Sequence, residues 1–146
     1  MGSTMNGAVI YKSRYGATQQ YADWMGKACK LPVLIPERID GQILAACDFL
    51  VLGTPVYTGE LLIKDWINDY RMILQNKELY LFVVCGSAMS NPLEQHQILR
   101  TNLPKNFIPP GNIFFLPGRL NIEDLTLTLP LPRLHEICHI ITGSRS

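Results

Sequence analysis

Three short segments hold most of the residues of this chain that can bind a charged or aromatic ligand. The first, residues 13–18, reads Ser-Arg-Tyr-Gly-Ala-Thr and lies directly before a helical pattern. The start of a helix carries N–H groups without partners and a partial positive charge, so it favours a phosphate dianion. Gly16 lets the backbone approach such an anion, and Ser13 and Thr18 add hydroxyl donors. A plain helix cap made by Ser13 or Thr18 explains the same residues without a ligand.

The other two segments also combine glycine with hydroxyl or aromatic side chains. Residues 53–60 read Gly-Thr-Pro-Val-Tyr-Thr-Gly-Glu, and residues 85–92 read Cys-Gly-Ser-Ala-Met-Ser-Asn-Pro. Each follows a continuous apolar run of the kind expected of a strand buried on both faces. None of the three segments has the Gly-Lys-Thr ending of a P-loop or a G-x-G-x-x-G pattern, which disfavours nucleoside triphosphate hydrolysis and a dinucleotide fingerprint.

The elements that must position these segments alternate between strand and helix patterns. Apolar runs predict five strands, and residues with helical periodicity lie between them. A last helix can run only from about residue 133 to residue 141, because Pro130 and Pro132 break anything that begins earlier. The strands are expected at 7–11, 32–35, 48–52, 78–85 and 113–116, and the helices at 17–29, 41–46, 61–74 and 92–103.

This alternation predicts an α/β fold with a parallel, doubly wound sheet and right-handed crossovers. Ligands of open parallel sheets bind outside the carboxyl ends of the strands, where the strand order reverses. All three segments leave strands at that edge. We therefore expect them to converge on one pocket.

At the first segment the chain resembles a known family. Ser13-x-Tyr15-Gly16-x-Thr18 after a first strand is similar to the phosphate loop of flavodoxins, (Ser/Thr)-x-Thr-Gly-x-Thr, with Tyr15 in place of the usual threonine. Residues 11–18, followed by Tyr21-Ala22-x-Trp24, resemble the flavodoxin-domain family that includes the menaquinone-dependent protoporphyrinogen oxidases. Residues 114–120 resemble its fifth-strand segment, and the likeness runs from about residue 6 to residue 125.

The resemblance implies a flavodoxin-like, five-stranded sheet in the order 2-1-3-4-5. It also implies a single short-chain domain over residues 5–142, with residues 1–4 and 143–146 as tails and a C-terminal helix that is irregular or partly missing. The implied cofactor is one non-covalently held flavin mononucleotide (FMN). The cofactor-binding residues carried over from the family are Ser13, Arg14, Tyr15, Gly16, Ala17 and Thr18 for the phosphate, Thr54, Pro55, Val56, Tyr57, Thr58 and Gly59 against the flavin ring, and Gly86, Ser87, Ala88 and Met89 on its other face.

The turn at residues 57–60 gives that match a physical reason. Tyr57-Thr58-Gly59-Glu60 suits a type II turn with Gly59 at the position of positive φ. The Thr58–Gly59 peptide can then turn its carbonyl toward flavin N5 when N5 gains a proton. Tyr57 packs on the ring in this interpretation, whereas a surface tyrosine is the alternative.

Three functions follow as hypotheses. The first is electron transfer through FMN to a redox partner protein. The second is an FMN-dependent oxidoreductase resembling menaquinone-dependent protoporphyrinogen oxidase, with a small molecule or quinone as electron acceptor. The third is a flavin-free interaction module of the same fold. No catalytic side chain can be assigned from the sequence. The oligomeric state is not predicted either.

Net charge and the positions of the cysteines and histidines argue against several kinds of partner and ligand. The net charge is +1, with scattered basic residues, so no nucleic-acid partner is expected. The four cysteines form no C-x-x-C pair and read as buried residues of a reducing compartment, and we expect a cytoplasmic protein. His135 and His139 are four residues apart but lack an evident third ligand, so no metal is expected. No signal peptide or membrane-spanning stretch is recognisable.

Overall fold

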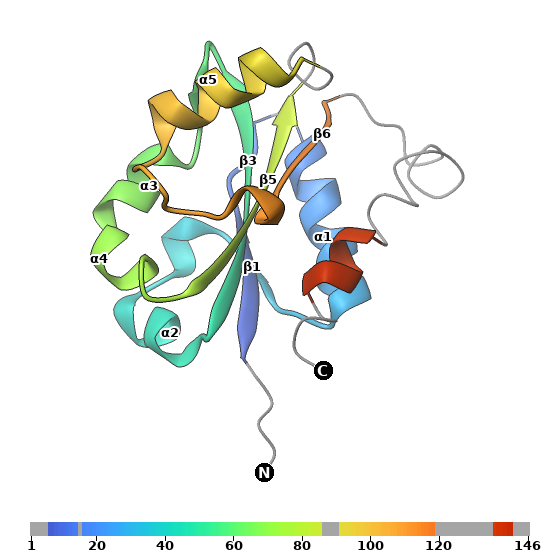
Figure 1. Ribbon diagram of the computed structural model, residues 1–146. Coiled ribbons are helices and arrows are strands. Elements are labelled where there is room, and N and C mark those ends of the chain that lie inside the picture. The colour runs from blue at the N-terminus through green and yellow to red at the C-terminus, as the bar shows by residue number, and fades with distance from the viewer. Residues whose placement is uncertain (1–5, 15, 86–90, 119–135, 142–146) are drawn as a thin grey trace.

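A parallel sheet lies at the centre of the computed structural model, which describes residues 6–14, 16–85, 91–118 and 136–141 (Figure 1). Its strands lie in the order β2-β1-β3-β5-β6, and this confirms the predicted doubly wound order. The chain passes from β1 to β2 on one side and then from β2 to β3 on the other side of β1, so the strand order reverses between β1 and β3, where a ligand site is expected. The strands are β1 (Gly7–Tyr11), β2 (Val33–Leu34), β3 (Phe49–Tyr57), β5 (Glu78–Cys85) and β6 (Ile113–Pro117).

The two central strands, β3 and β5, are buried on both faces. They pair in parallel over seven residues, with Leu52 opposite Leu81. Because successive side chains of a strand point to opposite faces, Leu50 and Leu52 enter one core while Val51 enters the other. This explains why the sequence of these strands is continuously apolar instead of alternating.

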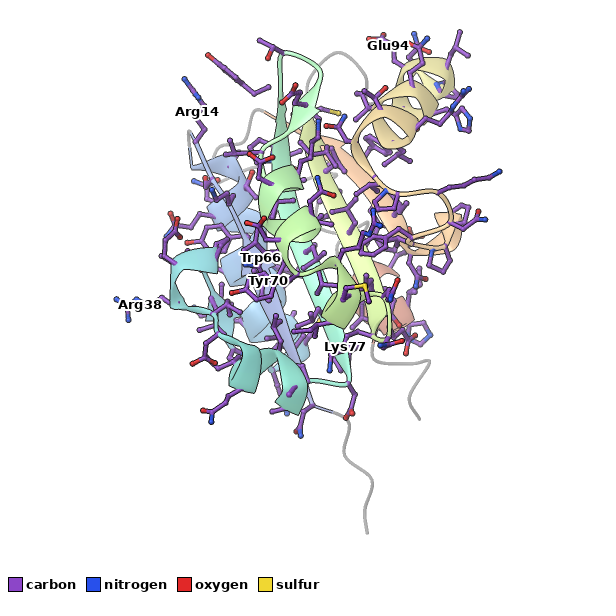
Figure 2. The ribbon with its side chains drawn as sticks, turned by 90° about the vertical axis from the view of Figure 1, so that its left-hand side faces the viewer. Arg14, Arg38, Trp66, Tyr70, Lys77 and Glu94 are labelled. Carbon is purple, nitrogen blue, oxygen red and sulfur yellow. The ribbon has the colours of Figure 1, made fainter. Side chains whose placement is uncertain are left out.

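Helices cover both faces of the sheet. On one face lie α1 (Ala17–Cys29) and a short helix at residues 136–141, whose buried side chains share a core cluster (Figure 1). The other face is covered by α2, α3, α4 and α5, and Trp66 of α3 packs there with its ring 5.3 Å from that of Tyr70 (Figure 2). These four helices span Gly41–Ala46, Lys64–Asp69, Arg71–Leu74 and Pro92–Asn102.

Two elements differ from the prediction by more than one residue at a boundary. The strand expected at residues 48–52 continues as β3 through Tyr57 and turns back into β4 (Glu60–Leu61), so residues 53–57 are extended strand. The helix expected at residues 61–74 is two helices, α3 and α4, separated at Tyr70, whose ψ of 17° leaves the helical range. Helical periodicity continues across that break, which is why the sequence pattern did not reveal it.

Short 3-10 helices at Pro36–Arg38 and Pro110–Asn112 complete the connections. The helix at residues 136–141 falls inside the last helix predicted from the sequence. Its buried residues Ile137 and Ile141 pack against the core of the α1 face. The expected tails, residues 1–4 and 143–146, lie outside the described residues.

Candidate functional site

The loop between β1 and α1 leads into the first turn of the helix through Gly16. Gly16 is the N-cap of α1 at φ 97°, a left-handed conformation that costs little only for glycine. Its N–H donates to Ser13 Oγ at 3.1 Å, which orients the Ser13 hydroxyl beside the helix end. A β-carbon at Gly16 would meet no atom of the described residues within 4 Å, its chain neighbours apart, so the space above the residue is open toward them.

The first turn of α1 has backbone N–H groups that donate no hydrogen bond to an N-cap side chain and can donate to a ligand. As the N-cap residue, Gly16 has no side chain that could accept from them, and its carbonyl already accepts from Gln20 N–H at 3.0 Å. Thr18 is only 2% exposed and lies beneath the loop. Ala17 is half-buried at the start of the helix, and Tyr15 lies outside the described residues. This end of a 13-residue helix suits a phosphate dianion.

Tyr57, the aromatic residue that the sequence suggested for the flavin ring, lies in the β3–β4 hairpin. Tyr57 pairs with Glu60 across the turn and is 41% exposed. Thr58 and Gly59 have φ values of 48° and 80°. Positive φ at both central residues is the mark of a type I′ hairpin turn, so the predicted type II turn is wrong. The β-strand pairing on either side explains the difference, because the twist of a type I′ turn matches that of the paired strands.

Asn102, at the end of α5, fixes this hairpin from below and was not found by sequence analysis. Its Nδ2 donates to the Gly59 carbonyl at 3.0 Å and to the Ile98 carbonyl at 2.8 Å. Its Oδ1 accepts from Leu61 N–H at 3.1 Å. The side chain is almost completely buried. Nothing in the sequence separates Asn102 from an ordinary polar residue at a helix end, because its partners lie about forty residues away.

Thr54 holds the same segment from inside the sheet. Its hydroxyl donates to the Pro55 carbonyl at 2.9 Å and accepts from Ile63 N–H at 3.1 Å. Because the residue is fully buried, its hydroxyl serves the fold rather than the surface. Pro55 and Val56 are half-buried next to it. The positions of Tyr57 and Thr58 are thus set by interior hydrogen bonds at both ends of the hairpin.

One contact brings the first two loops together. The Arg14 guanidinium carbon lies 3.8 Å from the centre of the Tyr57 ring, a cation–π arrangement. Arg14 projects from the same end of the sheet as the β3–β4 hairpin (Figure 2). These two loops therefore meet at one contact, while the single pocket that was predicted for them stays a prediction. The third predicted segment, Gly86, Ser87, Ala88 and Met89, lies outside the described residues.

Tyr21 ties α1 to the far strand of the sheet at this same end. Its hydroxyl donates to the Pro117 carbonyl at 3.0 Å, and the side chain is fully buried. Burial raises the pKa of Tyr21 far above its ordinary value, so the hydroxyl stays protonated and keeps donating. The start of α1 is thereby fixed relative to β6, which is two strands away from β3.

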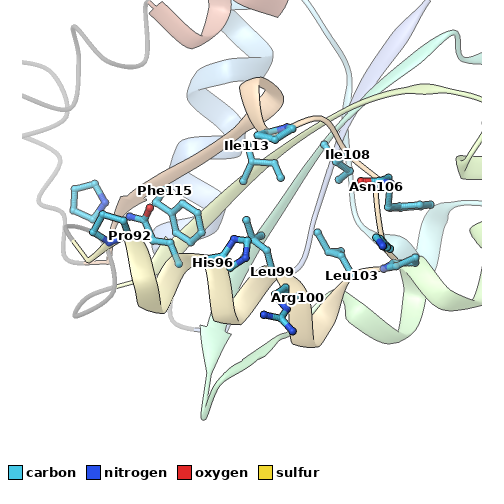
Figure 3. A pocket seen from close by; sticks show the side chains of 15 residues that line it. Pro92, His96, Leu99, Arg100, Leu103, Asn106, Ile108, Ile113 and Phe115 are labelled. Atoms are coloured by element: carbon cyan, nitrogen blue, oxygen red, sulfur yellow. The ribbon is translucent and has the colours of Figure 1, made fainter.

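A groove runs along β6 under α5, beside this end of the sheet (Figure 3). Its volume is roughly 1150 Å³, and its floor is apolar, with Leu99 facing Ile113 across it. His96, Arg100 and Lys105 supply positive or titratable groups, and none of the described residues that line it is acidic. Its polar lining residues are otherwise Gln95 and Asn106.

The described residues contain no cluster of three metal-binding side chains. His139 lies on the short terminal helix, whereas His135 is not among the residues described. No helix among these residues is long and apolar enough to cross a membrane.

Comparisons with known proteins identify the family to which this fold belongs. The model of the flavodoxin domain family matches residues 8–129, which is most of the chain. The chain belongs to the flavodoxin domain family. Its membership implies FMN as the cofactor and electron transfer through it as the general role. Among curated proteins none matches the chain.

Several solved flavodoxins share the fold. Oxidised flavodoxin 2 from Bacillus cereus is 19% identical with a TM-score of 0.69, covering 95% of this chain and 99% of its own. A short-chain flavodoxin associated with a PDU bacterial microcompartment is 15% identical with a TM-score of 0.66, covering 97% and 100%. A flavodoxin from the domain Archaea is 16% identical with a TM-score of 0.63, covering 94% and 99%. The flavodoxin fold thus spans nearly the whole chain.

The residues of this flavodoxin-domain chain fit FMN on their own chemistry. The open space over Gly16 and the amides of the α1 start suit the phosphate. Tyr57, with one face toward Arg14 and a large exposed fraction, suits a flat aromatic ring. Since Arg14 covers one face of Tyr57, a flavin ring must either use the other face or displace the guanidinium.

Proposed function

We propose that this chain is a single-domain electron carrier, extending over residues 5–142, that binds FMN and passes electrons to a redox partner in the cytoplasm. The observation that carries the proposal is the Arg14–Tyr57 contact, because it joins the phosphate loop and the ring hairpin at the carboxyl edge of the sheet. When bound, FMN supplies one- and two-electron redox chemistry. The flavin-free alternative loses support, since family membership implies the cofactor.

The protein's own part is to hold and orient. The α1 amides and Ser13 hold the phosphate, while Arg14 balances its charge. Asn102 and Thr54 hold the β3–β4 hairpin so that Tyr57 and the Thr58–Gly59 peptide meet the ring at fixed positions. In the proposal Gly86, Ser87, Ala88 and Met89 line the other face of the ring. The near-neutral net charge of +1 favours partners that do not depend on a strong charge of either sign.

The test is direct. Purified protein should be yellow, and FMN should be identified in it by mass after denaturation. Protein reduced anaerobically should then reduce cytochrome c, used as an artificial one-electron acceptor, within the mixing time of a stopped-flow instrument. Protein that binds no flavin, or whose flavin exchanges electrons only on a scale of hours, would contradict the proposal.

A second candidate function is a flavin-dependent oxidoreductase acting on a small molecule, as the resemblance to protoporphyrinogen oxidases suggests. The observation that favours it is the groove under α5, since an apolar floor with basic groups, and no acidic group among its described lining residues, suits an apolar anion (Figure 3). Pro117 and Pro92 both line this groove. Pro117 is the last residue of β6, and Pro92 begins α5, the helix that follows β5, so part of the groove lies near the carboxyl ends of these strands.

Turnover assays separate the two candidates. The enzyme hypothesis predicts steady-state oxidation of a porphyrinogen with a soluble menaquinone analogue as acceptor. Arg100→Glu should then raise KM several-fold while leaving the rate of cytochrome c reduction unchanged, and Arg71→Glu, on the exposed end of α4, is the matched control. Absence of turnover with intact FMN would leave the electron-carrier function and remove this one.

A further inference from the structure

Two cysteines far apart in the sequence meet on the α1 face of the sheet. Cys29 is the last residue of α1, and Cys138 lies in the helix at residues 136–141. Their sulfur atoms are 2.7 Å apart, across a sequence separation of 109 residues. Both are reduced thiols in this structure. A disulfide bond has a sulfur–sulfur distance of about 2.0 Å, so the two sulfurs need to approach by less than one ångström.

The surrounding core holds this pair in place. Ile137 and Ile141 on the terminal helix are buried in the same cluster as Tyr21 and Met25 of α1. The short helix lies directly against α1 (Figure 1). Cys138 follows Ile137 in the sequence, so packing of the isoleucines brings its thiol to the end of α1. The meeting of the thiols is therefore a consequence of how the terminal helix docks.

The other two cysteines have different surroundings. Cys47 and Cys85 belong to the core on the opposite face of the sheet. They cannot compete for Cys29 or Cys138 without crossing the sheet. Buried cysteines of an apolar core behave as small apolar side chains.

We propose that Cys29 and Cys138 form a reversible disulfide that fastens the terminal helix to α1 when the protein meets a peroxide. This site goes beyond the proposed function and does not depend on it. The Cys29 thiolate attacks one oxygen of hydrogen peroxide and the O–O bond breaks. The products are a sulfenic acid on Cys29 and a hydroxide ion. Cys138 sulfur then attacks the Cys29 sulfur, the S–OH bond breaks, and the thiol proton leaves with the hydroxyl as water. In total, two thiols and one hydrogen peroxide become one disulfide and two waters.

Cys29 takes the first step because it is the more accessible thiol. It is half-buried at the end of α1, whereas Cys138 is buried. The contact with Cys138 lowers the pKa of Cys29 and raises that of Cys138, so the thiolate resides on Cys29. Low-pKa, accessible cysteines next to a second thiol are those that oxidise reversibly.

Disulfide formation is expected to stabilise the fold without touching the flavin site. Cys29 lies at the opposite end of α1 from Gly16, about 20 Å away along a 13-residue helix. The closed loop would be long, which restricts the unfolded chain strongly. We expect the oxidised protein to melt roughly 5–15 °C above the reduced protein.

The experiment treats the purified full chain with a stoichiometric amount of hydrogen peroxide, under native conditions, followed by alkylation of remaining thiols. Peptide mapping without reductant should find one cross-link, between the peptides carrying Cys29 and Cys138. Dithiothreitol should remove the cross-link and the rise in melting temperature. FMN affinity should be equal in both states. Cys29→Ser should abolish both effects, and Cys47→Ala, on the opposite face, should retain them.

Three results would overturn the proposal. The first is oxidation of Cys29 that stops at sulfenic or sulfinic acid with Cys138 still alkylated. The second is a cross-link between other cysteines or between two chains. The third is a Cys29–Cys138 cross-link that forms only in denaturant. Because peptide mapping is done on the wild-type protein, the proposal stays testable even where the serine variant fails to fold.

Discussion

Replacement of Gly16 tests the proposed phosphate loop separately from the rest of the proposed flavin site. At φ 97° any residue with a β-carbon is strained, and the left-handed conformation costs about 1–2 kcal/mol. Among the described residues other than its chain neighbours, no atom lies within 4 Å of the β-carbon position, so a methyl group there adds no clash with them. Gly16→Ala should therefore destabilise the flavin-free protein by about 1–2 kcal/mol in urea unfolding, and Gly16→Val by more, because a β-branched side chain is disfavoured further at positive φ.

The two variants should differ in flavin binding. The branched side chain of valine fills the open space over the α1 amides, where the phosphate is held in the proposal, while the methyl of alanine leaves most of it open. Loss of one charge-assisted hydrogen bond amounts to about 1.5–3 kcal/mol, or a roughly 10- to 150-fold weaker Kd for FMN. Riboflavin, which has the same ring but no phosphate, should bind both variants as it binds the wild type.

Quenching of flavin fluorescence measures all of these constants. The quantity of interest is the ratio of the FMN and riboflavin affinities, because it cancels any general loosening of the fold. An unchanged ratio in Gly16→Val would refute the assignment of the loop to the phosphate. Equal losses for FMN and riboflavin would do the same, since they would place the damage at the ring.

Other substitutions test the β3–β4 hairpin, which faces the flavin ring in the proposal. Gly59→Ala places a β-carbon at φ 80° and should shrink the separation of the two one-electron potentials of bound FMN, measured by redox titration; an unaltered separation would remove the hairpin from potential control. Thr58→Gly should raise the free energy of unfolding by about 0.5–1 kcal/mol, because φ 48° then carries no β-carbon, and a loss of stability would contradict the type I′ turn. Asn102→Ala should lower it by about 2–3 kcal/mol, since Leu61 N–H is left buried without its partner, whereas a loss below 0.5 kcal/mol would show that the hairpin holds itself.

Much of the fold followed from sequence because local pattern and tertiary role agree. The strand at Gly7–Tyr11, the helix at Ala17–Cys29 and the strand at Glu78–Cys85 were predicted with the bounds that the structure has. In each, an apolar run or a helical stripe ends at a polar or turn-forming residue. The sheet order followed from the alternation of strands and helices together with the family resemblance.

The hairpin shows where such reasoning stops. Residues 53–60 contain glycine and proline, which indicate a loop, yet β3 continues to Tyr57 because β4 returns along it. That pairing depends on Asn102, about forty residues away, whose hydrogen bonds leave no local trace in the sequence. The turn type depends on the pairing, and so it could not be chosen from the four turn residues.

The candidate site was foreseen in its parts but not in its contacts. The glycine at the helix start was recognisable from its neighbours, and it has the positive φ that the phosphate loop needs. The stacking of Arg14 on Tyr57 was not foreseen, because it depends on the separation of two loops at the sheet edge. The meeting of Cys29 and Cys138 likewise depends on how two helices dock.

The most direct measurement is a titration of ¹⁵N-labelled protein with FMN and, separately, with riboflavin, followed by amide chemical shifts. FMN should move the amide signals of Gly16, Ala17 and Thr18 and saturate at one equivalent, while riboflavin moves signals of the 57–60 hairpin and leaves those three in place. FMN that binds tightly without moving the three amides would contradict a phosphate site at the start of α1.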